Sequence, residues 1–232
     1  MSNCSTCVVR NRSICSALDS TEIEALGAIS RVRVLRAGES LTWEGDDSIL
    51  LANVVEGLLK LVNSTVDGRE QIVGVVYPAD FIGRPFGGLT QYGVTALTES
   101  KVCVFARNDF DRLAHNHPTL EHRLLERTLD ELDKTRRWML LLGRMSAEQK
   151  LATFLIELSE RLVETGCEPS KMGPLDQFEL AFSRQQIADV LGLTIETVSR
   201  QFTALRRQGV IALPSRREVA ILNHAQLAAQ AG

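Results

Sequence analysis

The chain has 232 residues, of which 44% are hydrophobic and 24% charged, and its formal net charge is −3. This composition is typical of a folded globular protein and excludes a disordered, collagen-like or disulfide-stapled chain. The sequence has neither the roughly 18 consecutive apolar residues of a membrane span nor the basic start and apolar stretch of a secretory signal. We therefore expect a cytoplasmic protein that makes no membrane contact and keeps its five cysteines reduced unless a metal binds them.

The first half of the chain has the pattern of a small β-roll. Between residues 31 and 105, short β-branched runs such as Val102 to Phe105 alternate with turn signals that contain Gly, Asp, Asn and Pro. Turn signals at such short intervals are typical of a roll or barrel, and this stretch has no helical period. We expect a β-roll sensor domain over residues 21–117, preceded by a flexible, cysteine-rich sensor leader over residues 1–20.

The pattern changes at Pro118, a residue that suits the first turn of a helix. Apolar and Thr positions from Leu125 to Leu142 then recur at steps of three and four residues, as in a coiled-coil seam. An intramolecular core contact would give the same stripe, but the heavily charged flanks favour self-association. We expect a dimerisation helix over residues 118–145 and a homodimer. The predicted dimer contacts are Leu125, Leu132, Met139 and Leu142.

The remainder, residues 146–232, predicts a winged helix-turn-helix. Ser183 begins a capping box, Gly192 ends the short helix that follows, and Thr194 can cap a second helix over residues 195–208. Two short helices joined by a Gly-containing turn form a helix-turn-helix. Two β-like runs separated by a basic tip follow and indicate a wing whose tip suits phosphates.

The polar face of the second short helix carries the residue types that read base edges. Arg200 can hold guanine O6 and N7 with two hydrogen bonds, while Glu196 can accept from a cytosine amine or orient Arg200. The N-terminal half of such a helix is the part that enters the major groove. The expected partner is therefore double-stranded DNA. The predicted DNA-binding residues are Glu196, Ser199, Arg200, Thr203, Arg207, Ser183 and Arg216.

The distribution of charge agrees with that interpretation. Residues 183–217 hold six arginines against two acidic residues, a net charge of +4, so the rest of the chain sums to −7. A basic block on an acidic body indicates a module that faces phosphates. The alternative is a helix pair with a solvated charged face. The caps, the Gly turn, the arginine cluster and the wing together favour DNA binding.

This order of features, and the sequence from Leu191 to Arg200, resembles the Crp/Fnr family of bacterial transcription regulators, in its Fnr/FnrN/Anr-like branch with an N-terminal cysteine cluster. The resemblance covers nearly the whole chain. It implies an α+β fold with an N-terminal cyclic-nucleotide-binding-like β-roll, a long dimerisation helix and a C-terminal winged helix-turn-helix. The family pattern Glu-x-x-Ser-Arg falls on Glu196, Ser199 and Arg200 and implies palindromic sites with TTGAT-type half-sites. The turn from Asp67 to Gln71 resembles the family's hairpin that contacts RNA polymerase.

Four cysteines are candidate ligands. Three lie near the N-terminus in the spacing Cys4-x2-Cys7-x7-Cys15, and Cys103 lies far away in the last β-like run. Four thiolates can hold a [4Fe–4S] cluster, but they also suit zinc, and Cys103 could instead be a small buried apolar residue. The resemblance implies the cluster, because the Fnr branch has a three-cysteine leader and one distant cysteine. Cys4, Cys7, Cys15 and Cys103 are thus the predicted cofactor- and metal-binding residues, and Cys167 is interpreted as structural.

These features together predict an oxygen- or redox-responsive DNA-binding transcription regulator, an activator that is dimeric while its [4Fe–4S] cluster is intact. Oxygen attack on the cluster would release the leader, weaken the dimer and lower the DNA affinity. The alternative is a Crp/Fnr-family regulator with a zinc, thiol-redox or other non-cluster signal. Cyclic nucleotide binding is not expected, because residues 81–89 lack the Gly-Glu-Leu stretch and the Arg-Ser or Arg-Thr pair of that branch.

An enzyme is not predicted. The sequence has no Walker loop, no Gly-x-Ser-x-Gly elbow and no His-Glu-x-x-His motif. Three histidines, His115, His117 and His122, cluster around Pro118 and hint at a metal site. Solvated histidines at the start of a helix are the favoured interpretation.

Overall fold

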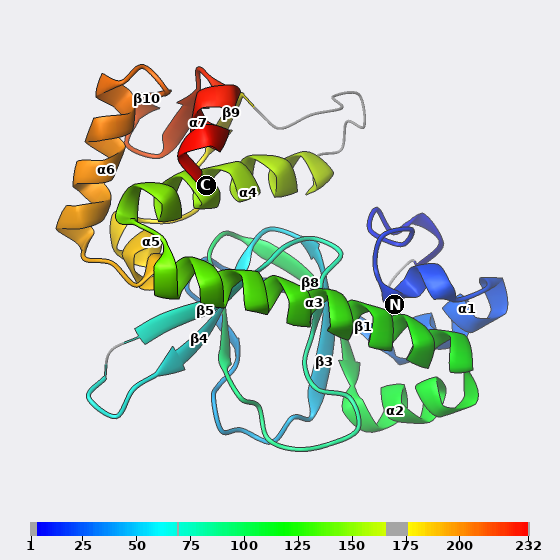
Figure 1. The fold of residues 1–232 in the computed structure, drawn as a ribbon. Coiled ribbons are helices and arrows are strands. Elements are labelled where there is room, and N and C mark those ends of the chain that lie inside the picture. The colour runs from blue at the N-terminus through cyan, green and yellow to red at the C-terminus, as the bar shows by residue number, and fades with distance from the viewer. Residues whose placement is uncertain (1–3, 69, 166–175, 232) are drawn as a thin grey trace. The chain divides into compact units, whose positions relative to one another are not determined.

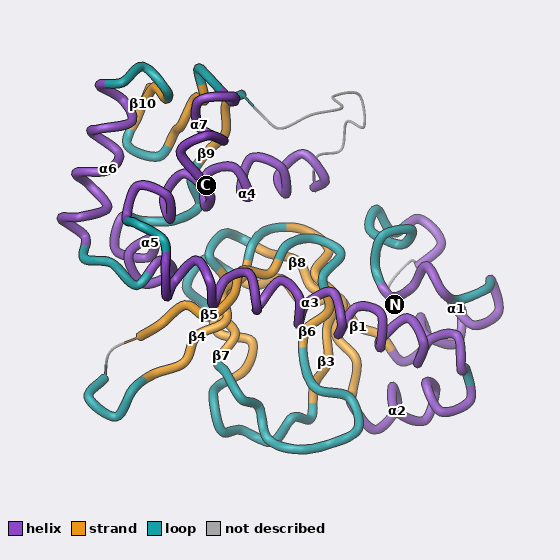
Figure 2. The backbone as a smooth tube through the Cα atoms, in the orientation of Figure 1, coloured by secondary structure: helices purple, strands orange, loops and turns teal. Residues whose placement is uncertain are grey.

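The computed structural model describes residues 4–68, 70–165 and 176–231. The chain divides into two compact units, Met1–Asp133 and Lys134–Gly232, and the boundary falls within the long helix α3. Figure 1 shows the elements of both units as a ribbon, and Figure 2 distinguishes helices, strands and loops. Within the described ranges, no helix combines the length and the apolar composition needed to cross a bilayer.

The N-terminal unit is built on two antiparallel four-stranded sheets that form the predicted β-roll. The sheets have the strand orders β1-β8-β3-β6 and β2-β7-β4-β5. Buried aliphatic side chains from both sheets, Leu35, Leu59 and Val102 among them, form one hydrophobic cluster of this unit. The strands are β1 Ser30–Leu35, β2 Ser40–Thr42, β3 Leu50–Glu56, β4 Leu59–Ser64, β5 Glu70–Val76, β6 Phe81–Ile82, β7 Gly93–Ala96 and β8 Ser100–Ala106.

Two helices that the sequence pattern did not predict flank the roll. Helix α1 (Ser20–Ile29) begins at a complete capping box of Asp19 and Glu22, and helix α2 (Arg107–Asn116) follows β8 directly. Asp19-x-x-Glu22 is a local signal that could have revealed α1. The rings of Phe110 in α2 and Phe105 in β8 pack at a tilt of 52° with their centres 5.7 Å apart, and this contact stabilises the position of α2 against the first sheet.

The N-terminal segment packs against this unit rather than forming the flexible leader that was expected. It contains two short 3₁₀ helices, η1 (Cys4–Thr6) and η2 (Ile14–Ala17). Val9, Ile14 and Leu18 are buried in a second hydrophobic cluster, together with side chains of α1, β3, β8 and α2. Burial of these three apolar residues supplies the free energy that orders the segment.

Helix α3 spans Pro118–Arg144 and begins at the proline, as the sequence predicted. Within the N-terminal unit, Leu120 and Leu124 of α3 are buried in the cluster that also holds Ile14. The guanidinium group of Arg127 donates a hydrogen bond to the backbone carbonyl of Arg12. The start of α3 is therefore joined to the cysteine-bearing segment by apolar packing and by this hydrogen bond.

The C-terminal unit has the predicted winged helix-turn-helix. Helix α4 (Ala147–Thr165) begins at a capping box, in which Gln149 N donates to Ser146 Oγ at 3.2 Å and Ser146 N donates to Gln149 Oε1 at 2.9 Å. Phe154 of α4 meets Phe182 edge-on, with ring centres 5.4 Å apart. The other elements are β9 Gln177–Glu179, α5 Arg184–Leu191, α6 Ile195–Arg207, β10 Ile211–Ser215, β11 Glu218–Ile221 and α7 His224–Ala231, with the sheet order β10-β11-β9.

Candidate functional site

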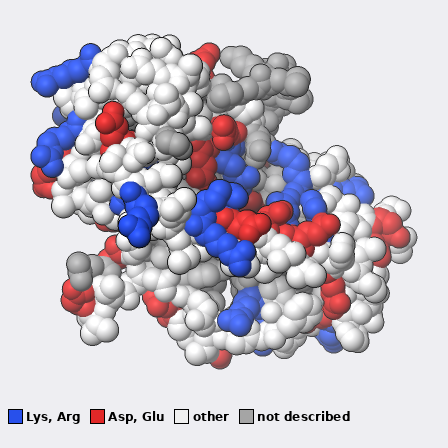
Figure 3. All heavy atoms as spheres, viewed as in Figure 1, with Lys and Arg blue, Asp and Glu red and all other residues white. Residues whose placement is uncertain are grey.

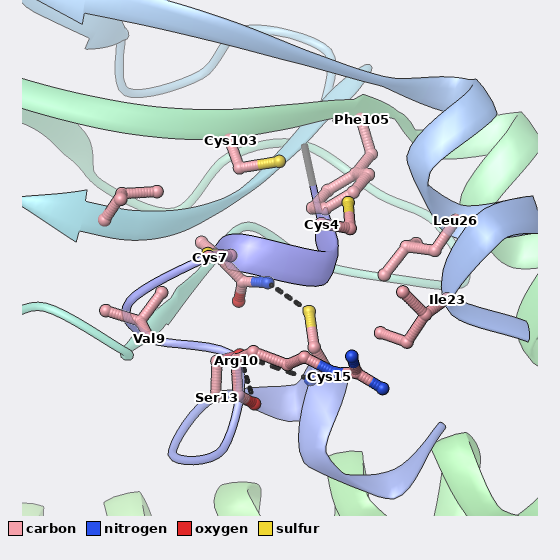
Figure 4. Close-up of a pocket in the computed structure, with 12 residues that line it drawn as sticks. Cys4, Cys7, Val9, Arg10, Ser13, Cys15, Ile23, Leu26, Cys103 and Phe105 are labelled. Carbon is pink, nitrogen blue, oxygen red and sulfur yellow. Dashed lines mark hydrogen bonds between the residues drawn. The ribbon is translucent and has the colours of Figure 1, made fainter. Parts of the chain in front are cut away.

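The four predicted ligand cysteines line one pocket in the N-terminal unit. Cys4, Cys7, Cys15 and Cys103 share it with apolar side chains such as Ile23, Leu26 and Phe105 (Figure 4). Cys103 is supplied by β8, whereas the other three come from the packed N-terminal segment. The fold thus brings together thiols that are up to 99 positions apart in the sequence. Cys167 lies outside the described residues.

Local structure positions two of these cysteines, Cys15 and Cys4. Ser13 is fully buried and caps η2, and its hydroxyl oxygen accepts a hydrogen bond from Cys15 N at 3.3 Å. The sulfur of Cys4 lies beside Gly27 of α1, where an added Cβ atom would stand 3.3 Å from Cys4 Sγ. Gly27 therefore leaves the space that the Cys4 thiol occupies. Neither Ser13 nor Gly27 was singled out by the sequence.

The pocket opposes ionisation of two of its thiols. Burial, together with charge repulsion from the neighbouring cysteines, raises the pKa of Cys103 to about 11, against a hydrogen bond with the Ser30 side chain that lowers it. Burial also raises the pKa of Cys15, as do Cys4 and Cys7 by charge repulsion. Four thiolates in such an apolar pocket repel one another, and a metal cation provides the compensating positive charge. The donor set therefore fits a thiolate-bound metal centre.

The thiols are not arranged as metal ligands. Among the described residues, no three His, Cys, Asp or Glu side chains are grouped so that they could hold a metal ion. All four described cysteines are free thiols. The pocket thus gathers the predicted donor set, and the assignment of Cys4, Cys7, Cys15 and Cys103 as ligands stays a prediction.

A polar residue that the sequence reasoning missed lies in the same pocket. Asn53 of β3 is only 2% exposed, and its Nδ2 atom donates a hydrogen bond to Cys15 Sγ at 3.4 Å (Figure 4, dashed line to the Cys15 sulfur). Asn53 is also the direct cross-strand partner of Cys103 in the pairing of β3 with β8. An isolated Asn in a buried strand could have been recognised as a polar residue with a specific partner.

The histidines do not form a metal site in the described part of the chain. His117 Nδ1 lies 2.7 Å from Glu22 Oε1 of α1, and His122 Nε2 lies 3.5 Å from Glu126 Oε1 on the same helix. His122 is largely exposed, in agreement with the interpretation as a solvated residue, whereas His117 is half-buried and is hydrogen-bonded to Glu22.

In the C-terminal unit, local hydrogen bonds form the helix-turn-helix as predicted. Gln186 N donates to the Ser183 hydroxyl at 3.1 Å, and Ser183 N donates to Gln186 Oε1 at 2.8 Å, which completes the capping box of α5. Gly192 ends α5 in the left-handed conformation, with φ of 61°, which favours glycine. Thr194 then caps α6 by accepting from Thr197 N at 3.3 Å.

The exposed face of α6 carries most of the predicted DNA-binding side chains. Glu196, Ser199, Arg200 and Arg207 are exposed, whereas Val198, Phe202 and Leu205 are buried on the opposite face. Thr203 is half-buried, and its hydroxyl donates to the carbonyl of Ser199 at 2.9 Å, so it is the least available of the predicted contacts. Ser183 is exposed, but its hydroxyl is the cap of α5.

Hydrogen bonds within α6 and its cap orient Glu196 and Arg200 in the DNA-free chain. Arg200 Nη2 donates to Thr197 Oγ1 at 3.1 Å, which orients the guanidinium. Hydrogen bonds from its own backbone N–H and from Thr194 lower the pKa of Glu196, and the charge of Arg200 lowers it further. Glu196 therefore remains an ionised acceptor at neutral pH.

Basic side chains also lie around α6. Figure 3 shows separate groups of Lys and Arg atoms there, with Asp and Glu atoms beside them. Arg216 is exposed at the tip of the wing, between the paired strands β10 and β11, as predicted. Arg184, one of the six arginines of the basic block, is half-buried, and its guanidinium carbon lies 3.4 Å from the centre of the Phe202 ring. These positions are compatible with DNA contact, which stays a prediction for each residue.

The predicted dimer contacts on α3 are exposed in the single chain. Leu125 is 55% exposed, Leu132 43% and Met139 68%. Leu142 is 37% exposed, and its Cδ2 atom lies 3.8 Å from the position of a Cβ added to Gly192. Large exposed apolar side chains spaced along one helix are typical of a surface that a partner covers.

Two family models match the chain. Residues 32–117 match the cyclic nucleotide-binding domain, and residues 149–230 match the Crp-like helix-turn-helix domain. The first range corresponds to the β-roll with α2, and the second to the winged helix-turn-helix with most of α4.

The chain is similar to characterised proteins over nearly its full length. It is 43% identical over 229 residues to the transcriptional activator protein FnrL of Cereibacter sphaeroides, which covers 99% of this chain and 92% of that protein. It is 40% identical over 210 residues to the nitrogen fixation regulation protein FixK of Bradyrhizobium diazoefficiens, with coverages of 90% and 86%. It is 33% identical over 233 residues to the transcriptional activator protein Anr of Pseudomonas aeruginosa, with coverages of 99% and 93%.

A solved structure agrees with these matches. The structure of FixK2 from Bradyrhizobium japonicum superposes with a TM-score of 0.79 at 27% identity and covers 88% of this chain and 98% of that one. Its fold, the two domain matches and the full-length relatives agree with the resemblance that the sequence motifs gave. The chain therefore belongs to the Crp/Fnr family of transcription regulators.

Proposed function

We propose that this protein is an oxygen- or redox-responsive transcription activator that binds TTGAT-type palindromes as a homodimer while a [4Fe–4S] cluster occupies the thiol pocket. The observation that carries the proposal is the convergence of four free thiols from two distant parts of the chain on one pocket. Relatives at 43% and 33% identity are named transcriptional activators, which supports activation rather than repression.

The residues around the pocket can transmit its state to the predicted dimer helix. Cys15 lies in η2, directly after the segment whose Arg12 carbonyl accepts a hydrogen bond from Arg127 of α3. Leu120 and Leu124 of α3 pack in the same cluster as Ile14. A change in the position of the cysteine-bearing segment therefore alters the surroundings of α3 just before the exposed Leu125 and Leu132.

When bound, the cluster would supply an oxygen-reactive centre and the positive charge that four thiolates require. Cys4, Cys7, Cys15 and Cys103 would hold it, which would fix the N-terminal segment against β8. Loss of those four bonds would leave the segment held by its apolar packing and by hydrogen bonds such as those of Arg127 with Arg12 and of Asn53 with Cys15. A differential stability of only a few kcal/mol between the two states is enough for such a switch.

DNA binding is proposed to follow the docking of other helix-turn-helix proteins. Helix α6 would enter the major groove with Glu196, Ser199 and Arg200 at the base edges, and Arg207 and Arg216 would contact phosphates. A dimer presents two such helices to half-sites about one helical turn apart. The β4–β5 hairpin is proposed to contact RNA polymerase through Asp67 to Gln71, which span its turn and the first two residues of β5. Arg69 within it lies outside the described residues.

The test is an anaerobic purification with iron, sulfide and zinc analysis, a visible spectrum, and a gel shift on a TTGAT palindrome before and after exposure to air. We expect about four irons per chain, a colour that bleaches in air, and loss of the shifted band with it. Cys103→Ser is expected to abolish iron binding and anaerobic DNA binding. Cys167→Ser, which keeps all four predicted ligands, is the matched control.

Other outcomes would replace the proposed signal. A colourless protein with one zinc per chain would support the zinc alternative. A metal-free protein whose DNA binding is lost on oxidation and regained with a thiol reductant would support the thiol-redox alternative. DNA binding that is equal in Cys103→Ser and wild-type protein under anaerobic conditions would contradict a sensing role for the pocket.

A further inference from the structure

Asn53 is a buried polar residue in the middle of an otherwise apolar strand. Strand β3 has the sequence Leu-Leu-Ala-Asn-Val-Val-Glu, and Asn53 is 2% exposed within it. Its Oδ1 atom is buried and has no hydrogen-bond partner among the described residues. Burying an unsatisfied amide oxygen destabilises the fold, whereas Leu or Val would fill the same place without that cost. The polar group therefore requires an explanation other than packing.

The surroundings of Asn53 supply that explanation. Its backbone pairs with Cys103 of β8 and with Phe81 of β6, and residues directly opposite in an antiparallel pair have side chains on the same face of the sheet. Its Nδ2 atom donates to Cys15 Sγ at 3.4 Å. Asn53 thus contacts Cys15 of η2 and lies directly opposite Cys103 of β8.

We infer that Asn53 is a positioning residue of the thiol pocket, which holds the sulfur of Cys15 against the sheet face that carries Cys103 and donates a hydrogen bond to that sulfur when it is a cluster ligand. The anchoring of the N-terminal segment to β3 concerns the metal-free chain and does not depend on the proposed function. The hydrogen bond to a cluster ligand rests on the proposed function.

Two physical effects follow from the inference. In the metal-free protein, the Asn53–Cys15 hydrogen bond adds a polar contact to the apolar packing of Val9, Ile14 and Leu18, so its loss loosens the segment. In the cluster-loaded protein, an N–H donor withdraws electron density from the ligand sulfur. Hydrogen bonds to the sulfurs are among the determinants of cluster reduction potential.

The test uses the full-length chain with three substitutions. Asn53→Leu keeps the branched shape and removes the amide, and Asn53→Gln keeps the carboxamide on a longer stem. Val54→Ala is the matched control, because Val54 is fully buried in the other hydrophobic cluster, so it weakens the same strand without touching the thiol pocket.

The first measurement is amide hydrogen exchange of the metal-free, reduced protein, followed by mass spectrometry of peptides from residues 13–18. Asn53→Leu is expected to raise the exchange of these residues about two- to tenfold relative to wild type, which corresponds to the loss of one hydrogen bond. Val54→Ala is expected to leave them unchanged, and Asn53→Gln to restore part of the protection. Equal exchange in wild type and Asn53→Leu would overturn the anchoring role.

The second experiment measures the reduction potential and the resonance Raman spectrum of the anaerobically reconstituted protein. Asn53→Leu is expected to shift the reduction potential to a more negative value and the iron–thiolate stretching bands in the resonance Raman spectrum to higher frequency, with partial return in Asn53→Gln. Unchanged bands and potential in Asn53→Leu would overturn the donor role. Failure of wild-type protein to take up a cluster would instead refute the proposed function, and the exchange experiment would still decide whether Asn53 anchors the segment.

Discussion

The guanidinium carbon of Arg184 lies 3.4 Å from the centre of the Phe202 ring, so the first residue of α5 is fastened to the buried face of α6. Burial lowers the pKa of Arg184, but an arginine remains charged at neutral pH. A cation over an aromatic ring stabilises such a contact by about 0.5–2 kcal/mol, depending on how far it is removed from water.

Replacement of Arg184 should therefore destabilise the C-terminal unit. We expect Arg184→Met to lower the free energy of unfolding by about 1 kcal/mol in urea unfolding followed by circular dichroism. Arg206→Met, an exposed arginine in the last turn of α6, is the control and should change stability little. Equal stability of the two variants would show that the ring contact contributes nothing.

Arg200 is expected to control the sequence specificity of DNA binding. Its side chain is exposed and oriented by Thr197, so it is free to bind a base edge. Arg200→Ala should cost about 1–3 kcal/mol on a TTGAT palindrome and much less on unrelated DNA, as measured by fluorescence anisotropy. A uniform loss on both DNAs would assign Arg200 to the phosphates instead.

Arg216 at the wing tip should behave differently, because a phosphate contact has no sequence preference. Arg216→Ala is expected to weaken binding to specific and unrelated DNA alike and to reduce the slope of log K against log salt concentration by about 1. The measurement is the same anisotropy titration at several salt concentrations. An unchanged slope would place the wing tip away from the DNA backbone.

Leu132 should be essential for self-association if the exposed stripe of α3 is the dimer seam. A carboxylate at this position would be buried against its symmetry mate, so Leu132→Glu is expected to give a monomer in anaerobic sedimentation. Leu140→Glu, on the same helix but outside the 3.5-residue repeat, is the matched control, since Leu140 is 58% exposed. A dimer in Leu132→Glu would move the interface elsewhere.

Glu39 provides a pH-dependent contribution to the stability of the N-terminal unit. Hydrogen bonds from the backbone N–H of Arg36 and the side chain of Arg33 lower the pKa of Glu39 from its usual value of 4.5. Because the pKa is lower in the folded state, this contribution is present above pH 4.5 and is lost as the pH falls through the folded-state pKa.

A Glu39→Gln variant removes the titrating group and should flatten this dependence. Thermal unfolding between about pH 3 and pH 7 is expected to show wild type more stable than the variant near neutral pH, with the difference shrinking in acid. A difference that is independent of pH would mean that Glu39 acts through the shape of the turn and not through its charge.

The local elements of this protein could be predicted from residues a few positions apart. Ser183 with Gln186, Gly192 and Thr194 delimit α5 and α6 because capping and left-handed termination depend on hydrogen bonds within one helical turn. The β-roll and the start of α3 at Pro118 were predicted on the same kind of evidence. Helix α1 was not predicted, although its capping box is equally local, because its ten residues have only a weak amphipathic pattern, with Ile23 and Leu26 as the buried pair.

The thiol pocket was only partly visible in the sequence. The spacing of Cys4, Cys7 and Cys15 marked them as a group, and Cys103 joined them through the family resemblance. Asn53 stood out only as a polar residue in an apolar run, and its partners could not be predicted, because its relation to Cys15 and Cys103 depends on the register between β3 and β8 and on the packing of the N-terminal segment. Sequence patterns report contacts made within one element. Contacts between residues distant in the chain arise only when strand pairing and burial of apolar side chains bring the elements together.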